Sequence, residues 1–381
     1  MSNTIKTNYY DSFRCKADGC SLTCCQEWRI PIDEKTAKKW KEARLDGVPK
    51  NLCHYLEKEE DDYIMTLNEE KKCPFLNNEK LCKVFIELGE ELLSETCIRY
   101  PRRINRFEKR TEYALDFGCP EAIDLINRDL GDNLFVEEGI EEEEVPALYE
   151  LRSMMLAVLA DDSYQLTERL LMLFYVLLEL LGEKELSVEA VQAYETEEYF
   201  KALGQEVKKL EVDPIDTLWE RNELFLDMIQ NYRAQEIYVD YLEEIAQYAE
   251  GLDTYYSDAE LLGKIETFEK AFLAYEGLIK NYWMSEVFAS CLMEGMELKD
   301  LVVVFEWLIM AYCAMKHAIF ISWLREDQQV VEYTLVRKYI TVLSRVTGYE
   351  QEDILDYLEN SFEDVILEWG YLALILGKER L

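Results

Sequence analysis

The segment from Leu301 to Leu324, LVVVFEWLIMAYCAMKHAIFISWL, constrains the fold more than any other part of the chain. Apolar side chains fill most of its positions, but Glu306, Lys316 and His317 interrupt it. It therefore lacks the roughly 18–20 uncharged residues that a membrane span requires. The apolar segment 166–181 also contains three charged residues and fails the same criterion. We expect both segments to be buried core helices and predict no membrane span.

The sequence around these segments has a helical periodicity. After residue 146, proline occurs only at Pro214, and apolar residues recur at three- and four-residue spacing. This pattern covers stretches near 147–160, 164–182, 214–250, 258–294, 298–325 and 328–376. No strand followed by GxGxxG and no GxxxxGK[ST] loop is present, which disfavours dinucleotide and P-loop chemistry. We predict a mainly α protein with a large all-helical domain over 147–381.

The first part of the chain has a different texture. Nine of the 11 cysteines precede residue 120, and we predict an irregular, cysteine-rich, metal-binding domain over 1–135. Stretches 63–67 and 112–117 could form short strands, whereas 33–46 and 120–130 have helical patterns. The acidic run 136–146, which ends in a proline, is typical of a solvated linker.

The charge is as uneven as the cysteines. The chain carries 41 Lys+Arg and 78 Asp+Glu, a net charge of −37. Residues 1–135 contain 22 basic and 26 acidic side chains, a net of −4, which leaves 19 basic and 52 acidic, a net of −33, for the rest. Phosphate contacts require cations, so this balance excludes a general nucleic-acid binder. The acidic half favours a basic protein surface as partner, although acidity also serves solubility alone.

The N-terminus and the histidine content narrow the chemistry further. The opening sequence MSNTIKTNYYDSF lacks the charged, apolar and cleavage regions of a secretory signal, so we expect a cytoplasmic, reducing location. Clustered thiols in such a compartment favour metal ligation over disulfides. The two histidines, His54 and His317, cannot build a His-rich zinc site, and a Ser-His-Asp triad would need one of them.

The cysteine spacing is the most specific feature of the sequence. Thiolates this closely spaced can converge on zinc or on an iron–sulfur centre. Eight ligands are twice the number that one tetrahedral site needs, so two sites, or one site with additional thiols nearby, both fit. We interpret Cys291 and Cys313, which lie in helical runs, as buried apolar residues. The predicted metal ligands are Cys15, Cys20, Cys24, Cys25, Cys73, Cys82, Cys97 and Cys119.

A basic patch follows Cys97 in a chain that is short of cations, and it contains Arg99, Arg102 and Arg103. Neighbouring cations lower the pKa of thiols and favour ligation. Arginine also pairs with carboxylates, and we therefore assign these three residues to cofactor binding. An ordinary solvated strand or loop is the alternative.

Taken together, these residues resemble the flagellin lysine-N-methylase family, called FliB. The N-terminal part of that family is similar to a broader group of proteins described as zinc- or iron-chelating cysteine-cluster proteins. The resemblance covers roughly residues 10–125. It is carried by Phe13-x-Cys15-x4-Cys20-x3-Cys24-Cys25-x2-Trp28, Cys73-Pro74-Phe75-Leu76, Leu81-Cys82, Leu93-Ser94-x-Thr96-Cys97-x2-Tyr100-Pro101-Arg102 and Cys119-Pro120-Glu121-Ala122. Downstream, Tyr275-Glu276-x4-Asn281-Tyr282 also looks like the family.

The resemblance implies a cytoplasmic enzyme that methylates lysine ε-amines on flagellin. Its methyl donor would be S-adenosylmethionine, and its cysteines would hold a [4Fe–4S] cluster. The CxxxCxxC triplet of radical S-adenosylmethionine enzymes is absent, so the mode of cofactor binding and the catalytic residues stay open. The alternative is a non-catalytic zinc or iron–sulfur scaffold, or an electron-transfer protein, that docks a basic partner. For the enzyme, we expect S-adenosylmethionine and lysine to meet where the two domains join.

Overall fold

The structure is a computed structural model of the chain, and it describes residues 3–28, 30–59, 62–128, 130–131, 133–139, 146–235, 238–346, 351–362 and 367–378. The helices of the first part are α1 (Glu34–Trp40), α2 (Lys83–Leu88), α3 (Glu95–Arg99) and α4 (Pro120–Ile126). Those of the second part are α5 (Ala147–Ala160), α6 (Leu166–Leu181), α7 (Val188–Tyr194), α8 (Glu197–Val207), α9 (Pro214–Gln235), α10 (Val239–Glu250), α11 (Leu252–Tyr255), α12 (Asp258–Phe272), α13 (Glu276–Ser290), α14 (Leu298–Arg325), α15 (Tyr333–Val346), α16 (Gln351–Phe362) and α17 (Trp369–Leu376).

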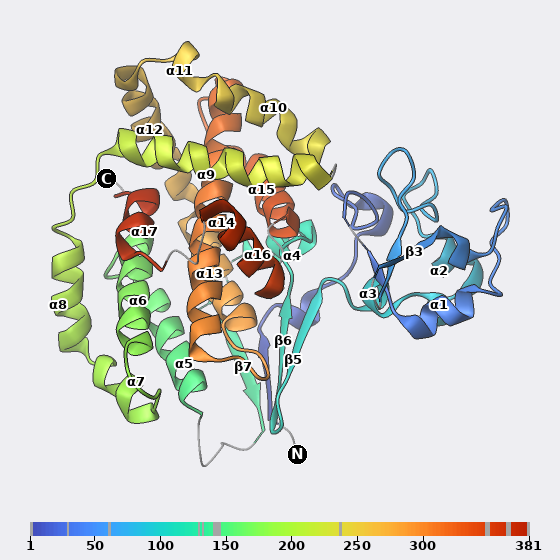
Figure 1. The fold of residues 1–381 in the computed structure, drawn as a ribbon, viewed down its shortest axis with the longest axis horizontal. Helices are drawn as coiled ribbons and strands as arrows, with labels where there is room; N and C mark the ends of the chain where they lie inside the picture. The colour runs from blue at the N-terminus through green and yellow to red at the C-terminus, as the bar shows by residue number, and fades with distance from the viewer. Residues whose placement is uncertain are drawn as a thin grey trace.

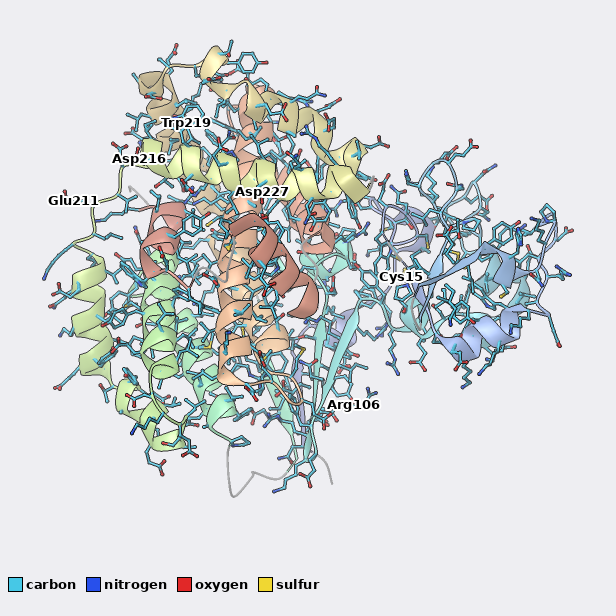
Figure 2. The ribbon with its side chains drawn as sticks, viewed as in Figure 1. Cys15, Arg106, Glu211, Asp216, Trp219 and Asp227 are labelled. Carbon is cyan, nitrogen blue, oxygen red and sulfur yellow. The ribbon has the colours of Figure 1, made fainter. Side chains whose placement is uncertain are left out.

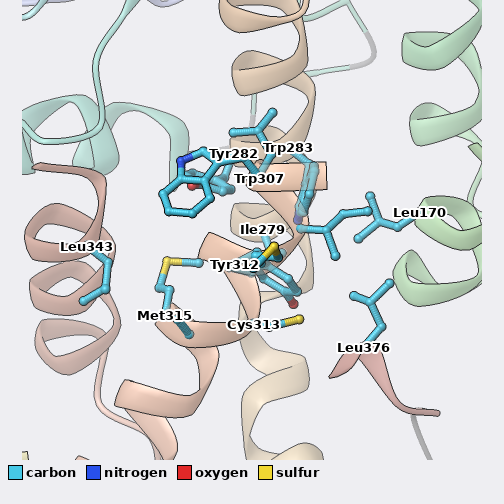
Figure 3. Packing of buried hydrophobic residues seen from close by; sticks show 14 of the residues in the cluster. Leu170, Ile279, Tyr282, Trp283, Trp307, Tyr312, Cys313, Met315, Leu343 and Leu376 are labelled. Carbon is cyan, nitrogen blue, oxygen red and sulfur yellow. The ribbon is translucent and has the colours of Figure 1, made fainter. Parts of the chain in front are cut away.

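Helix α14 is the centre of the molecule, and other helices surround it (Figure 1). Every residue from 301 to 324 is buried, as the apolar sequence predicts. Figure 3 shows this core, in which the Trp283 ring of α13 lies 5.5 Å from the ring of Tyr312. Within the described residues, no helix has the length and apolarity to cross a bilayer.

Glu306, Lys316 and His317, which interrupt the apolar sequence of α14, have partners inside the helical body. Glu306 accepts a hydrogen bond from the backbone N–H of Leu367 at 2.8 Å, and burial raises its pKa to about 7. The ammonium of Lys316 pairs with a carboxylate of α12 at 2.8 Å. The imidazole of His317 lies 2.9 Å from the side-chain oxygen of Asn222. These contacts offset part of the cost of burying the three groups, and Glu306 Oε2 has no hydrogen-bond partner in the described residues.

A four-stranded sheet packs against the helices at the lower end of the view in Figure 1. Its order is β5-β6-β1-β7, with β1 parallel to β6 and antiparallel to β7. Ile5 and Ala114 of the sheet share a small core with Phe288 and Ala289 of α13, so this helix covers one face. The strands are β1 (Asn3–Thr7), β5 (Arg102–Arg106), β6 (Arg110–Leu115) and β7 (Phe135–Glu138).

The small lobe, which we define as residues 25–99, projects to the right in Figure 1. It has its own hydrophobic core, which includes Ile32, Trp40, Leu52 and Phe75. Helices α1–α3 accompany a three-stranded antiparallel sheet of order β2-β4-β3. Its strands are β2 (Pro31–Ile32), β3 (Leu56–Glu59) and β4 (Asp62–Met65).

The mainly α fold with a small strand-containing N-terminal region is confirmed. Stretches 63–67 and 112–117 overlap β4 and β6, and 120–130 contains α4. The predicted domain boundaries at 135 and 146 stay a prediction, and part of the N-terminal region packs into the helical core. Tyr9, Phe13 and Phe117 belong to the large helical core, because the sheet needs α5 and α13 to cover a face. Residues 136–138 of the predicted linker lie in β7, and 140–145 lie outside the described residues.

Candidate functional site at the junction of the small lobe and the helical body

The structure arranges the eight predicted ligands as two neighbouring sets of thiols. All of them are free cysteines. The lobe thiols are Cys25, Cys73, Cys82 and Cys97, and the junction thiols are Cys15, Cys20 and Cys119. Cys24 interacts electrostatically with members of both sets and joins them.

Local backbone structure positions each lobe thiol. The N–H of Cys73 donates to the carbonyl of Cys25 at 2.8 Å, which joins two segments 48 residues apart in the sequence. Cys82 is the residue before α2. Ser94 caps α3 by accepting a hydrogen bond from the N–H of Cys97 at 3.1 Å. Turn and cap chemistry therefore gathers cysteines that are dispersed in the sequence.

Burial and mutual repulsion dominate the electrostatics of the lobe thiols. Burial, with a smaller effect of neighbouring thiolates, raises the pKa of Cys73 to about 12 and that of Cys97 to about 11. The hydrogen bond with Cys24 and burial raise the pKa of Cys25 further. The pKa of Cys24 is instead lowered to about 7, first by its hydrogen bond with Cys25 and then by the positive charge of Arg345.

These thiols fit a soft metal centre in donor chemistry, since enclosed thiolates are the preferred ligands of zinc and of iron–sulfur clusters. Their present spacing does not form a ready site for one ion. Across the described part of the chain, no group of three or more His, Cys, Asp or Glu side chains is placed to hold a metal ion.

A cavity of about 220 Å³ lies beside the junction thiols, between the segment that leads into the small lobe and the helical body. Figure 2 shows Cys15 at this junction. The cavity is lined by Cys15, Cys20, Cys24, Cys119, Phe13, Tyr100, Lys16, Glu121, Asp124, Arg337 and Arg345, among others. Pockets for drug-sized ligands span roughly 300–1,000 Å³, so this cavity suits a group of side-chain size.

Arg345 of α15 fastens both cysteine-bearing segments beside the cavity. Its guanidinium donates to the carbonyls of Leu22 at 2.8 Å, Thr23 at 3.1 Å and Gly118 at 2.7 Å. These residues lie just before Cys24 and Cys119 in the chain. The helical body therefore controls where the sulfur atoms of the junction lie.

A second contact joins α15 to the wall of the cavity. Arg337 donates to Asp124 of α4 at 2.7 Å and to the hydroxyl of Ser21 at 3.1 Å. The Tyr333 hydroxyl donates to the same Asp124 carboxylate at 2.6 Å. Sequence reasoning missed these α15 residues, because an arginine in an amphipathic helix ordinarily faces solvent and nothing local marks these as site residues.

The structure disperses the three arginines that we assigned to cofactor binding. Arg99 ends α3 and lies 3.3 Å from the Glu95 carboxylate, with half of its side chain exposed. Arg102 lies over the Phe13 ring at 5.1 Å. Arg103 donates to the Ser290 hydroxyl at 3.0 Å. None of the three is among the residues that line the cavity, and their role in cofactor binding stays a prediction.

Comparison with known proteins identifies the class to which this arrangement belongs. The family model for the FliB lysine N-methylase C-terminal domain matches residues 152–375, from α5 to α17. This match covers more than half of the chain. The protein therefore belongs to the FliB lysine N-methylase family, a family of protein-lysine methyltransferases, as the sequence resemblance implies. The match does not include the cysteine-rich region.

Individual relatives support the same family assignment. The chain is 30% identical over 122 residues to the flagellar biosynthetic protein FliU of Salmonella muenchen. This aligned region covers 31% of this chain and 72% of that protein. It is 29% identical over 122 residues to the lysine-N-methylases of Salmonella typhimurium and Salmonella choleraesuis, which covers 31% of this chain and 30% of each relative. No solved structure matches the chain.

Proposed function

We propose that this protein transfers a methyl group from S-adenosylmethionine to lysine ε-amines of flagellin in the cytoplasm. The observation that carries the proposal is the family match over the helical body. The flagellar name of one relative and the lysine-N-methylase names of two others support a flagellar substrate and lysine as the acceptor. The net charge of −33 after residue 135 suits attraction of a lysine-bearing surface.

The chemistry that this reaction requires fits the junction cavity. A lysine amine has an ordinary pKa of about 10.4, so it must lose a proton before its nitrogen can attack a sulfonium methyl group. Partial burial disfavours the ammonium form and lowers the pKa of a bound lysine. A cavity of side-chain size would also limit the orientations of the amine, which favours in-line methyl transfer.

The cysteines are the proposed ligands of a [4Fe–4S] cluster, with zinc as the alternative metal. The lobe thiols together with Cys24 supply enough donors for one such centre. When bound, a thiolate-ligated centre would bring the small lobe and the cavity wall into a fixed relation, as structural metals do. The residues that bind S-adenosylmethionine are not assigned.

Methyl transfer is tested by mass spectrometry of flagellin incubated anaerobically with the protein and S-adenosylmethionine. We expect lysines heavier by the mass of a methylene group, about 14 Da. Unmodified flagellin under these conditions would overturn the proposal and favour a non-catalytic scaffold or electron-transfer role.

The metal is tested separately with Ser substitutions at Cys24, Cys25, Cys73 and Cys97. We expect these variants to lose bound iron and methylation together, whereas Cys313→Ser, in the buried core of α14, should retain both. Full methylation in a variant without iron would exclude a role for the cluster in the reaction. A colourless protein loaded with zinc would replace the iron–sulfur assignment with a zinc site.

A further inference from the structure

Glu121 is a buried carboxylate that lines the junction cavity. It lies in the first turn of α4, and its side chain is only 8% exposed. Its ion-pair partner in the described residues is Lys16, whose Nζ lies 3.3 Å from Oε1. The side chain of Lys16 is 54% exposed, so its stem reaches the cavity from solvent.

A buried carboxylate is unfavourable without a cation, and the other cations of this cavity are committed elsewhere. Arg345 donates to three backbone carbonyls, and Arg337 pairs with Asp124. The group that neutralises Glu121 is therefore a lysine ammonium on a partly exposed side chain. Lysine is also the proposed methyl acceptor. The Lys16–Glu121 pair therefore shows that the Glu121 carboxylate accommodates a lysine ammonium.

We propose that the junction cavity is the acceptor-lysine subsite, in which Glu121 binds the ε-ammonium of the substrate and Lys16 occupies that place until the substrate displaces it. This inference rests on the proposed function for the choice of substrate. The exchange replaces one ammonium with another when the substrate binds. The bound ammonium must then pass its proton to a base or to water before the free amine can attack the methyl group. Lys16 then acts as an internal competitor that weakens the binding of substrate lysine.

The geometry favours this exchange over a permanent ion pair. A distance of 3.3 Å is longer than the 2.7–2.9 Å of a close charge-assisted contact. More than half of the Lys16 side chain is exposed, so the pair gains little from burial of its cation. A substrate lysine inserted in the cavity would pair with the same carboxylate from a more buried position.

The experiment measures lysine binding without methyl transfer. The full chain, free of S-adenosylmethionine, is titrated with a short lysine-containing flagellin peptide, and the same peptide with norleucine in place of lysine reports any binding that does not need the ammonium. We expect Glu121→Gln to raise the Kd about tenfold or more, because a charge-assisted contact is lost. We expect Lys16→Met to lower the Kd several-fold, because the competitor is removed.

Lys6→Met is the matched control. Lys6 also pairs with a carboxylate, that of Asp11 at 2.6 Å, but it does not line the cavity. This variant should bind the peptide as the wild type does. An unchanged Kd in Lys16→Met, or equal tightening in Lys6→Met, would overturn the inference. Lys16 is at the surface, so this variant keeps the test valid even where Glu121→Gln fails to fold.

Failure of this inference can be distinguished from failure of the proposed function. If flagellin is methylated but neither Glu121→Gln nor Lys16→Met changes peptide binding, the acceptor subsite is wrong and the function stands. If flagellin is not methylated but both variants shift the Kd as expected, the lysine subsite stands and the assigned reaction is wrong.

Discussion

Arg345→Met should release the cysteine-bearing segments from the helical body. In the wild type, one guanidinium donates to the carbonyls of Leu22, Thr23 and Gly118. Methionine has a similar apolar stem but no donor. The substitution therefore removes the hydrogen bonds while it keeps most of the packing.

The magnitude follows from the three contacts. Hydrogen bonds from a charged donor contribute about 1.5–3 kcal/mol each, but contacts that share one guanidinium are not additive. We expect the local opening of these segments to become easier by about 3 kcal/mol. A change of that size corresponds to roughly 100-fold faster hydrogen exchange, since about 1.4 kcal/mol is a factor of ten.

Hydrogen exchange read by mass spectrometry on peptides that cover residues 20–28 and 115–120 measures this opening. Arg325→Met is the matched control, because Arg325 forms an ion pair with Glu244 at 2.6 Å on the exposed side of the body. Its loss should change the free energy of unfolding by at most about 1 kcal/mol. If hydrogen exchange in the two peptides is the same in Arg345→Met as in the wild type, the hydrogen bonds of Arg345 do not hold these segments in solution.

Three further substitutions test separate parts of the structure. Burial lowers the pKa of His317 to about 3 from 6.5, so below pH 6.5 the unfolded chain binds a proton that the folded chain does not, and stability falls as the pH falls. Between pH 7 and 5, the free energy of unfolding of His317→Gln should therefore fall by about 2 kcal/mol less than that of the wild type, as measured by urea unfolding. Equal decreases in the two proteins would contradict the lowered pKa of His317. Gly118→Ala would place a Cβ 2.7 Å from Tyr100 Oη, so we expect a loss of about 1–3 kcal/mol in thermal unfolding, and an unchanged Tm would disprove the close contact. Arg152→Met removes two 2.6 Å contacts from the buried Glu112 carboxylate, which keeps the guanidinium of Arg110 at 2.9 Å, and should cost about 1.5–3 kcal/mol in urea unfolding, whereas an unchanged free energy of unfolding would show that the pair is not essential.

Much of the helical fold could be predicted because its signal is local. The stretch 147–160 coincides with α5, and 298–325 coincides with α14, since both present apolar residues with a period close to 3.6 over several turns. Helices α7 and α8 escaped prediction. Residues 188–207 contain six charged side chains and few large apolar ones, and α8 buries only Gly204 and Val207.

The sheet shows why the rest could not be predicted. Strand β1 is five residues long and pairs with β6 and β7, more than a hundred residues away. The sequence of Asn3–Thr7 does not indicate which strands it pairs with, and a strand of five residues has only a weak strand pattern in its sequence. The sheet shares its core with α5 and α13, a contact that no local sequence pattern indicates, and the predicted boundaries at 135 and 146 stay a prediction.

The sequence by itself determined that the chain has a buried helical core, that its cysteines gather in the first third, and which family these motifs resemble. Those properties follow from composition, periodicity and spacing, which are local. Only the tertiary structure brought Glu121, Lys16 and Arg345 to one cavity and divided the thiols into lobe and junction sets. Their proximity depends on how α15 docks beside α4 and the N-terminal segment, and such contacts between residues up to 323 positions apart arise from packing of whole elements.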